Sequence, residues 1–385
     1  MTNDTKKYEQ QITNVCERAF ENGNDLGSAL QACEGLFPTV AVSKFFAFDR
    51  HRTQRWIDQA RAEVRAQSHR SNKYGSSFIL STWDFCEEAC EAISAQALST
   101  GPRTCLLGVP SIVPYLSTGK AAAPHVLIDL RIRSTESNEN VVYMERDINT
   151  LNGQEFSKAF QFCFLDPPWY LKNFLKWIDL AGEYCREGGT VAFALLGRLT
   201  RPKAVSDREE ILQHCRARGL TVQIHKDLVL YDVPSFEGHM LWRAGIPPVR
   251  WKRADLVIAK RDEWVTSVAK MPPLEPLPPF GQVKILGVSI DVVFDRYETA
   301  TNDLILEPPG GYWMETPSRR ALGVLESNVF TSNGAKLISP RPVDLFSALS
   351  RLESSHKLIS KRNVERLGFP TEVFDDLSDA QQSVI

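Results

Sequence analysis

The feature that most constrains the fold is an alternation of short apolar strands and helices between Thr104 and Lys260. The expected strands are residues 105–107, 126–130, 160–165, 190–195, 221–229 and 256–260. The expected connecting helices are residues 113–116, 171–184 and 207–218. Such alternation predicts an α/β fold with a parallel sheet that is covered on both faces. Ligands of such a sheet bind beyond the carboxyl ends of its strands.

The chain is too long for a single core, because 385 residues exceed the size at which one hydrophobic core stops growing. With 43% hydrophobic and 24% charged residues it has the composition of a soluble globular protein. We therefore expect several parts. These are a helical part (1–74), a connector (75–103), the α/β domain (104–265), a proline-rich linker (266–280) and a smaller α+β region (281–385).

The net charge and the cysteine spacing indicate the cellular compartment of the protein and the partners it can bind. A net charge of −2 gives no global signal for nucleic acid or membrane, and no apolar stretch is long enough for a signal or a membrane span. The eight cysteines are scattered, which indicates free thiols in a reducing compartment. Cys86 and Cys90 have the spacing of half a metal site, but no second ligand pair follows. We expect a cytoplasmic protein without a structural metal.

The helical part contains a pattern typical of a helix-turn-helix. Helices are expected at residues 8–21, 26–37, 40–48 and 52–66, and the last two are separated by a tight turn. The segment from Ser43 to Lys73 contains eight basic and three acidic residues. Arg50, Arg52, Gln54 and Arg55 would then lie at the amino end of a recognition helix and contact nucleic acid. The alternative is an amphipathic helix with a solvated basic face.

The candidate catalytic residues are Asp166, Pro167, Pro168 and Trp169, which directly follow the expected strand 160–165. Two successive prolines keep the backbone extended, so that its carbonyl groups stay available as acceptors. An amine held by the Asp166 carboxylate and a carbonyl would present its lone pair for attack on a methyl group. Trp169 offers a face for stacking on a base, and Tyr170 would extend that wall. The alternative is a strand-ending turn with a buried tryptophan.

This Asp-Pro-Pro-Trp run resembles the [D/N]-P-P-[Y/F/W] motif of S-adenosylmethionine (SAM)-dependent amino-methyltransferases. Residues 107–113, 127–131 and 146–149 match in order, and the sequence is most similar to the probable N6-adenine methyltransferase family. The resemblance implies a Rossmann-like class I methyltransferase domain with SAM as cofactor. It further implies a set of cofactor-binding residues: Gly108, Pro110, Ser111, Asp129, Arg131 and Asp147. The first loop departs from the family because it lacks a G-x-G-x-G run.

Three functions remain open from the sequence. The first is methylation of the N6 amine of adenine in DNA or RNA, with Arg198, Arg201 and Lys203 on a basic loop contacting the phosphate backbone. The second is methylation of protein lysine. The third is a catalytically silent methyltransferase fold that serves as a DNA-binding or scaffolding subunit. The C-terminal region carries no chemical motif, and we expect that it either binds a protein partner or completes the substrate cleft.

Overall fold

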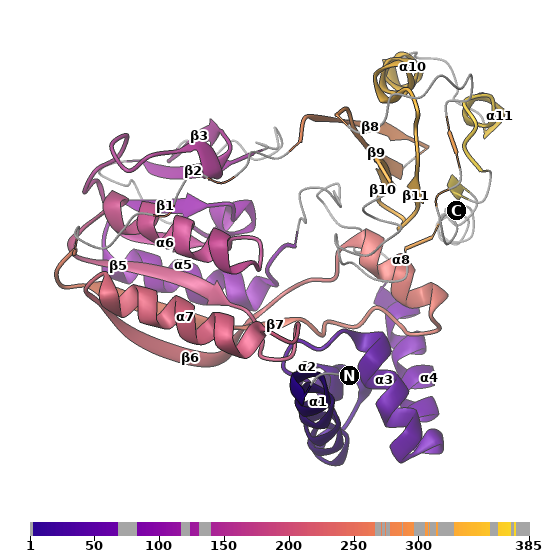
Figure 1. Cartoon of the computed structure of the whole chain (residues 1–385), viewed down its shortest axis with the longest axis horizontal. Coiled ribbons are helices and arrows are strands. Elements are labelled where there is room, and N and C mark those ends of the chain that lie inside the picture. Colours follow the sequence, from indigo (N-terminus) through magenta and orange to yellow (C-terminus); the bar gives the residue numbers. More distant parts are fainter. Residues whose placement is uncertain are drawn as a thin grey trace. The chain divides into compact units, whose positions relative to one another are not determined.

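A computed structural model gives the fold of the chain (Figure 1). It describes residues 3–67, 83–116, 124–130, 140–265, 271, 274, 278–286, 288–295, 305–306, 308, 313–314, 327–354, 361–370 and 373–374. The chain divides into two compact units. Unit 1 comprises residues 1–56, 83–232 and 250–277, and unit 2 comprises residues 57–82, 233–249 and 278–385.

Unit 1 is built on a seven-stranded sheet with the strand order β3-β2-β1-β4-β5-β7-β6. Its strands are β1 (Thr104–Leu107), β2 (His125–Asp129), β3 (Val141–Glu145), β4 (Phe160–Leu165), β5 (Cys185–Leu195), β6 (Leu220–Leu230) and β7 (Arg253–Arg261). Neighbours from β3 to β5 are parallel, but β7 is antiparallel to both β5 and β6. The predicted parallel sheet is thus confirmed for β1 to β5, but the prediction is wrong for β7. Strand β3 was not predicted either, because it is short and half exposed and therefore lacks a buried apolar run.

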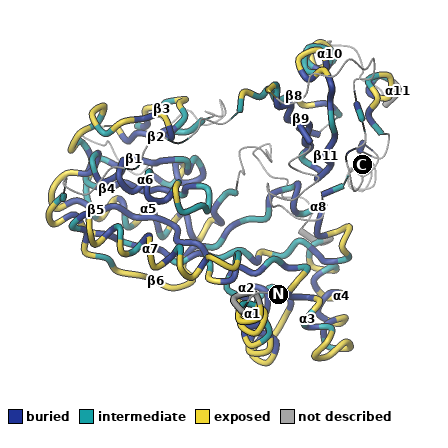
Figure 2. The backbone as a smooth tube through the Cα atoms, viewed as in Figure 1, coloured by how far each residue is buried: buried dark blue, intermediate teal, exposed yellow. Residues whose placement is uncertain are grey.

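Helices cover both faces of this sheet (Figure 1). One face packs against α6 (Leu171–Tyr184) and α7 (Ala204–Ala217), and the other against α5 (Glu87–Thr100) and the 3₁₀ helix η1 (Pro110–Leu116). Strand β4 is buried on both sides, because Cys163 and Leu165 face the first cluster and Phe162 and Phe164 the second. Edge strand β6 is largely exposed along its length (Figure 2). The sheet therefore has a deep centre at β1, β4 and β5.

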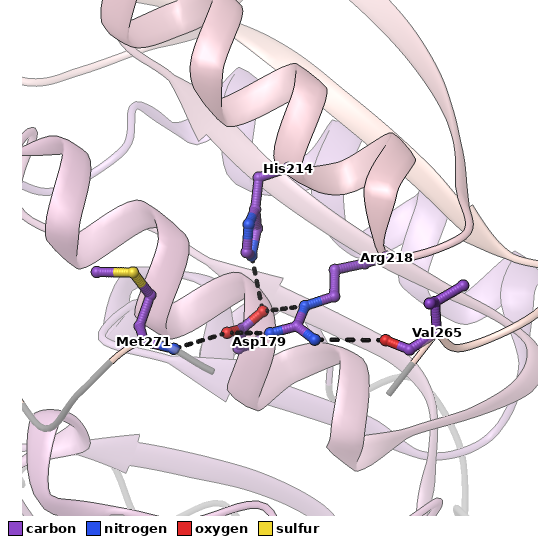
Figure 3. A network of polar contacts seen from close by, with 5 residues as sticks. All are labelled: Asp179, His214, Arg218, Val265 and Met271. Carbon is purple, nitrogen blue, oxygen red and sulfur yellow. Dashed lines mark hydrogen bonds and ion pairs between the residues drawn. The ribbon is translucent and has the colours of Figure 1, made fainter. Parts of the chain in front are cut away.

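A buried ion-pair network fixes α6 to α7 on the first face (Figure 3). The Arg218 guanidinium donates two hydrogen bonds to the Asp179 carboxylate, each 2.7 Å long. The His214 ring lies 2.7 Å from the same carboxylate, and Arg218 also donates to the Val265 carbonyl at 3.3 Å. Burial alone would raise the pKa of Asp179, but hydrogen bonds from His214 and Arg218 lower it. The network joins α6, the end of α7 and the segment after β7.

The N-terminal helices of unit 1 are α1 (Asn3–Asn22), α2 (Leu26–Gln31) and α3 (Pro38–Phe48). Asp25 caps α2 by accepting a hydrogen bond from the Ser28 amide. The turn after α2 contacts the loop that follows β5, because the Leu199 amide donates to the Glu34 carbonyl at 2.9 Å. Tyr8 of α1 donates to the Leu199 carbonyl at 2.8 Å. These helices are thus part of the unit that holds the sheet.

Helix α4 (Arg50–Gln67) begins in unit 1 and ends in unit 2. Unit 2 also contains α8 (Ser235–Arg243) and a four-stranded antiparallel sheet in the order β11-β10-β9-β8. Its strands are β8 (Phe280–Ile285), β9 (Val288–Val293), β10 (Val329–Thr331) and β11 (Lys336–Leu337), and two helices follow, α10 (Pro342–Ser354) and α11 (Lys361–Glu365). Leu345 and Leu349 of α10 join the core of this sheet. The predicted α+β character of the C-terminal region is confirmed.

All eight cysteines are buried and none forms a disulfide. Within the described part of the chain, no three His, Cys, Asp or Glu side chains are grouped as metal ligands. A search of the described helices finds none with the length and apolar character of a bilayer span.

Candidate functional site

The Asp-Pro-Pro-Trp run connects β4 to α6 at the carboxyl edge of the sheet, where the sequence placed it. Leu165 at the end of β4 is paired with Leu107 at the end of β1, and the Asp166 amide donates to the Leu107 carbonyl at 3.4 Å. The chain then bends at Trp169 and Tyr170, where the Tyr170 amide donates to the Pro168 carbonyl at 2.6 Å, and Tyr170 is the N-terminal flanking residue of α6. Because prolines cannot donate to the strand ladder, the chain leaves the sheet at Asp166, directly beyond the carboxyl end of β4.

Asp166 has an altered pKa. Removal of its carboxyl group from water is the largest effect and raises the pKa to about 6. The positive charge of Lys252 and hydrogen bonds from the Tyr231 and Trp169 side chains act in the opposite direction. The Tyr231 hydroxyl donates to Oδ1 of Asp166 at 3.0 Å. Asp166 is therefore an oriented carboxylate at neutral pH that can still take up a proton.

Trp169 is half buried and belongs to an aromatic group around Lys252. The Lys252 ammonium lies 3.9 Å from the ring centre of Trp83, 4.0 Å from that of Trp169 and 4.5 Å from that of Tyr231. We call Trp83, Trp169 and Tyr231 the aromatic cage. Trp169 and Trp83 both meet Tyr231 edge to face, with ring centres 5.8 and 6.0 Å apart. The indole that the sequence proposed as a stacking wall thus lies beside a cation.

The first loop begins with Gly108, whose φ of +69° turns the chain at the end of β1. Its amide donates to the Ile128 carbonyl at 2.9 Å, and a Cβ here would lie 3.0 Å from the Trp177 ring. Pro110 starts η1, and Ser111 is buried, with its hydroxyl accepting a hydrogen bond from the Phe85 amide at 3.4 Å. One glycine therefore makes the turn, and the chain continues into the 3₁₀ helix η1.

Two carboxylates follow the neighbouring strands at the same edge. Asp129 ends β2, and its carbonyl accepts a hydrogen bond from the Arg146 amide at 2.9 Å. Asp147 follows β3 and caps the short helix η2 (Ile148–Thr150), with its carboxylate accepting from the Asn149 amide at 2.9 Å. Arg131, the remaining residue of the expected cofactor set, lies outside the described residues. Across the sheet, this edge therefore carries Asp147 after β3, Asp129 at the end of β2 and Asp166 after β4, with β1 between the last two strands.

The basic residues of the loop after β5 differ from one another. Arg198 and Lys203 are exposed, as a contact with a phosphate backbone requires. Arg201 instead forms an ion pair with Asp207 at 2.7 Å and donates to the carbonyl of Trp169. Its guanidinium also lies 5.8 Å from the Tyr170 ring. Arg201 therefore holds the Asp-Pro-Pro-Trp run in place.

In the N-terminal helices, Arg50, Gln54 and Arg55 are exposed on α4. Arg52 lies 4.6 Å from the ring centres of both Phe20 and Trp56, and donates to the Gly23 carbonyl at 2.6 Å. These contacts give Arg52 a structural role within unit 1.

Sequence reasoning missed Trp83, Tyr231 and Lys252. Tyr231 directly follows β6 at the carboxyl edge, and the rule that polar residues at strand ends bind ligands was the available signal. Lys252 directly precedes β7, so a parallel β7 would have placed it at the opposite edge. Because β7 is antiparallel, Lys252 lies beside Tyr231, whose amide donates to the Lys252 carbonyl at 3.1 Å.

No protein-family model and no curated protein sequence matches the chain. Solved structures do resemble it. A mutein of the branched-chain polyamine synthase from Thermus thermophilus, in complex with N4-aminopropylspermidine and 5'-methylthioadenosine, has 11% identity and a TM-score of 0.53, covering 69% of this chain and 91% of that one. The synthase itself, with the same ligands, has 12% identity and a TM-score of 0.51, covering 68% and 90%.

The chain has a Rossmann-like class I methyltransferase fold. The similarity to the polyamine synthase mutein covers 69% of the chain, which is more than the span Thr104–Arg261 that contains the seven-stranded sheet. A SAM-dependent methyltransferase from Mesorhizobium loti also resembles the chain, with 13% identity, 44% of this chain and 96% of that chain covered, and a TM-score of 0.30.

Proposed function

We propose that the chain is a SAM-dependent transferase that alkylates an amine nitrogen of its substrate, and that the Asp166 carboxylate holds this amine. The observation that supports this proposal most is the Asp166 carboxylate, which is oriented by Tyr231 and lies one residue beyond the strand pair β1–β4. A carboxylate in this position can accept a hydrogen bond from an N–H group and direct the nitrogen lone pair away from itself. The reaction then depends on positioning and electrostatics.

The residues at the sheet edge fit SAM by the chemistry of their side chains. Asp129 and Asp147 provide carboxylate acceptors for ribose hydroxyl and adenine amine groups, and Gly108 turns the chain beside them. When bound, SAM would supply an electrophilic methyl group, whose bond to the sulfonium sulfur breaks as the bond to the acceptor nitrogen forms, leaving a neutral thioether. After Gly108 the chain continues into η1, where Pro110 and Pro114 restrict the backbone.

The acceptor nitrogen loses a proton when its new N–C bond forms. Asp166 holds the N–H group before transfer and takes this proton afterwards, since its pKa of about 6 allows it to carry either form. Arg201 keeps the carbonyl of Trp169 fixed, so the run cannot move away from the acceptor during transfer.

We infer that the acceptor is the N6 amine of adenine in nucleic acid. This amine is planar and neutral, and the Asp-Pro-Pro-Trp run combines a carboxylate with an aromatic wall for the base, where stacking contributes ~1–3 kcal/mol. Exposed Arg198 and Lys203 beside the site, and Arg50, Gln54 and Arg55 on α4, supply groups for a phosphate backbone.

A second candidate is N-alkylation of an aliphatic polyamine. The specific observation that favours it is the similarity to a polyamine synthase that was solved with N4-aminopropylspermidine and 5'-methylthioadenosine. Its donor would carry both a methyl and an aminopropyl group on the sulfonium sulfur. The aminopropyl group would be transferred to the amine, and the methyl group would stay on the sulfur in 5'-methylthioadenosine.

A transfer assay separates these functions. The full chain is incubated with methyl-labelled SAM and single-stranded DNA, double-stranded DNA, RNA or spermidine, and with decarboxylated SAM and spermidine. We expect label in N6-methyladenine with wild type, and a loss of roughly 100-fold or more with Asp166→Asn. Product only from spermidine would replace the acceptor by an aliphatic amine, and no product with any acceptor would contradict transferase activity of the chain.

A further inference from the structure

The aromatic cage is a complete cation site, and a residue of the chain fills it. Three ring centres lie within 4.5 Å of the Lys252 ammonium, which is inside the range of a strong cation–π contact. Asp166, hydrogen bonded to the cage residue Tyr231, adds a negative charge next to it. Three rings and a carboxylate form the type of site that proteins use to bind alkylammonium ligands.

Lys252 is held in this position by its backbone. Its carbonyl accepts the Tyr231 amide hydrogen bond at 3.1 Å at the start of β7. The preceding residue, Trp251, is buried and packs edge to face on Phe37, with ring centres 5.7 Å apart, and on Trp83 at 6.1 Å. The Lys252 side chain therefore extends from backbone that is hydrogen bonded and packed directly before β7.

The charges around the cage are balanced. Lys252 offsets the charge of Asp166, and the neighbouring Asp232 carboxylate is paired with Arg250 at 2.6 Å. A protonated amine that approached Asp166 would meet the Lys252 charge and would find the cage already filled. A neutral amine is not repelled by the Lys252 charge and does not need the cation position of the cage, because it requires only an acceptor for its N–H.

We propose that Lys252 is a specificity-determining residue, which occupies the cation position of the site and thereby restricts the acceptor to neutral amines. This inference rests on the proposed amine transfer at Asp166. It predicts that removal of the Lys252 ammonium opens a binding site for an alkylammonium ion that the wild-type protein does not offer.

The test measures binding of n-butylammonium and spermidine to the full chain without SAM, by calorimetry and by tryptophan fluorescence. We expect Lys252→Ala to bind both cations with an affinity roughly tenfold or more above that of wild type. Lys226→Ala, which removes an exposed lysine of β6, serves as the matched control and should behave as wild type. Near-ultraviolet circular dichroism verifies that each variant is folded.

Two results would overturn the inference. If wild type binds spermidine as tightly as Lys252→Ala, Lys252 yields its place to the ligand and the acceptor is an aliphatic amine. If folded Lys252→Ala binds neither cation, the cage is no cation site. Should the alanine variant not fold, Lys252→Met, whose side chain ends before the position of Nζ, is tested with methylammonium under the same criteria. Since no SAM is present, failure of methyl transfer leaves these readouts unchanged.

Discussion

Asp166 and Tyr231 are 65 residues apart along the chain, yet their side chains form one hydrogen-bonded pair at the sheet edge. Burial destabilises the ionised form of Asp166, whereas Lys252, Tyr231 and Trp169 stabilise it. The balance leaves a carboxylate that is ionised at neutral pH but close to its titration range. A single neighbouring hydroxyl can therefore change the pH range in which the site works.

Tyr231→Phe tests this balance. The proposed mechanism needs ionised Asp166, so the wild-type rate should rise with pH through about 6. Loss of the hydroxyl removes a hydrogen bond to the ionised form, which raises the pKa of Asp166 further and moves the rise to higher pH. A pH profile of kcat/KM at saturating SAM measures the shift. An equal fall in rate at every pH, with no shift, would contradict the assigned role of Tyr231.

At the scale of the elements, the β1–η1 connection depends on one glycine. Gly108 has a φ of +69° and lies under the Trp177 ring, whereas Gly188 in β5 has a φ of +71° and open space where a Cβ would lie. Gly188→Ala should cost about 1–2 kcal/mol for the left-handed backbone alone. Gly108→Ala should cost more, because the Cβ also meets the ring at 3.0 Å. Urea denaturation compares the two variants, and equal losses would show that Trp177 yields without cost.

The Asp179 network joins α6 to α7 and makes a second prediction at this scale (Figure 3). Asp179→Asn leaves the nearly fully buried Arg218 without its carboxylate and should lower the free energy of unfolding by about 3–5 kcal/mol. Because the pKa of Asp179 is lowered by folding, its contribution is present above the ordinary Asp value of about 3.9 and is lost as the pH falls through the folded value.

Urea denaturation at neutral pH and in acid measures both effects. Glu187→Gln, which removes an exposed ion pair with Lys158, is the control and should leave stability almost unchanged. A loss for Asp179→Asn no greater than that for the control would contradict the role of the network.

Many of the helices and strands could be predicted from the sequence. Helix α6 has the predicted limits, and the Asp-Pro-Pro-Trp run lies at the end of its predicted strand. Both predictions succeed because apolar periodicity and prolines determine secondary structure through residues that are close in the sequence. The direction of β7 could not be predicted, since its apolar residues fit a parallel and an antiparallel strand equally well. Because the direction of β7 determines the edge at which Lys252 lies, neither the position of Lys252 nor the residues of the aromatic cage could be predicted.

At the scale of the whole molecule, the proposed nucleic-acid contact depends on which arginines of α4 are available. The sequence treated Arg50, Arg52 and Arg55 alike, because local charge does not reveal stacking partners. In the fold, Arg50 and Arg55 are exposed, while Arg52 stacks on Phe20 and Trp56. The three residues should therefore respond differently to substitution.

Arg50→Gln and Arg55→Gln should weaken DNA or RNA binding without loss of stability, and each should reduce the salt dependence of binding by about one phosphate contact. Arg52→Gln should chiefly lower the melting temperature, because it removes two cation–π contacts and a hydrogen bond. Fluorescence anisotropy at several salt concentrations and thermal denaturation measure the two effects. Unchanged binding by Arg50→Gln and Arg55→Gln would contradict a nucleic-acid contact at α4.

The central claim is that SAM and the acceptor amine bind at separate places on the sheet edge, SAM at Asp129 and the amine at Asp166. Calorimetric titration with SAM tests this claim most directly. We predict that wild type binds SAM, that Asp129→Asn weakens binding by roughly tenfold or more through loss of a charged hydrogen-bond acceptor, and that Asp166→Asn binds within a few-fold of wild type. Absence of binding by wild type at millimolar SAM would contradict the cofactor site. Equal weakening by both substitutions would contradict the division of the sheet edge into a donor side and an acceptor side.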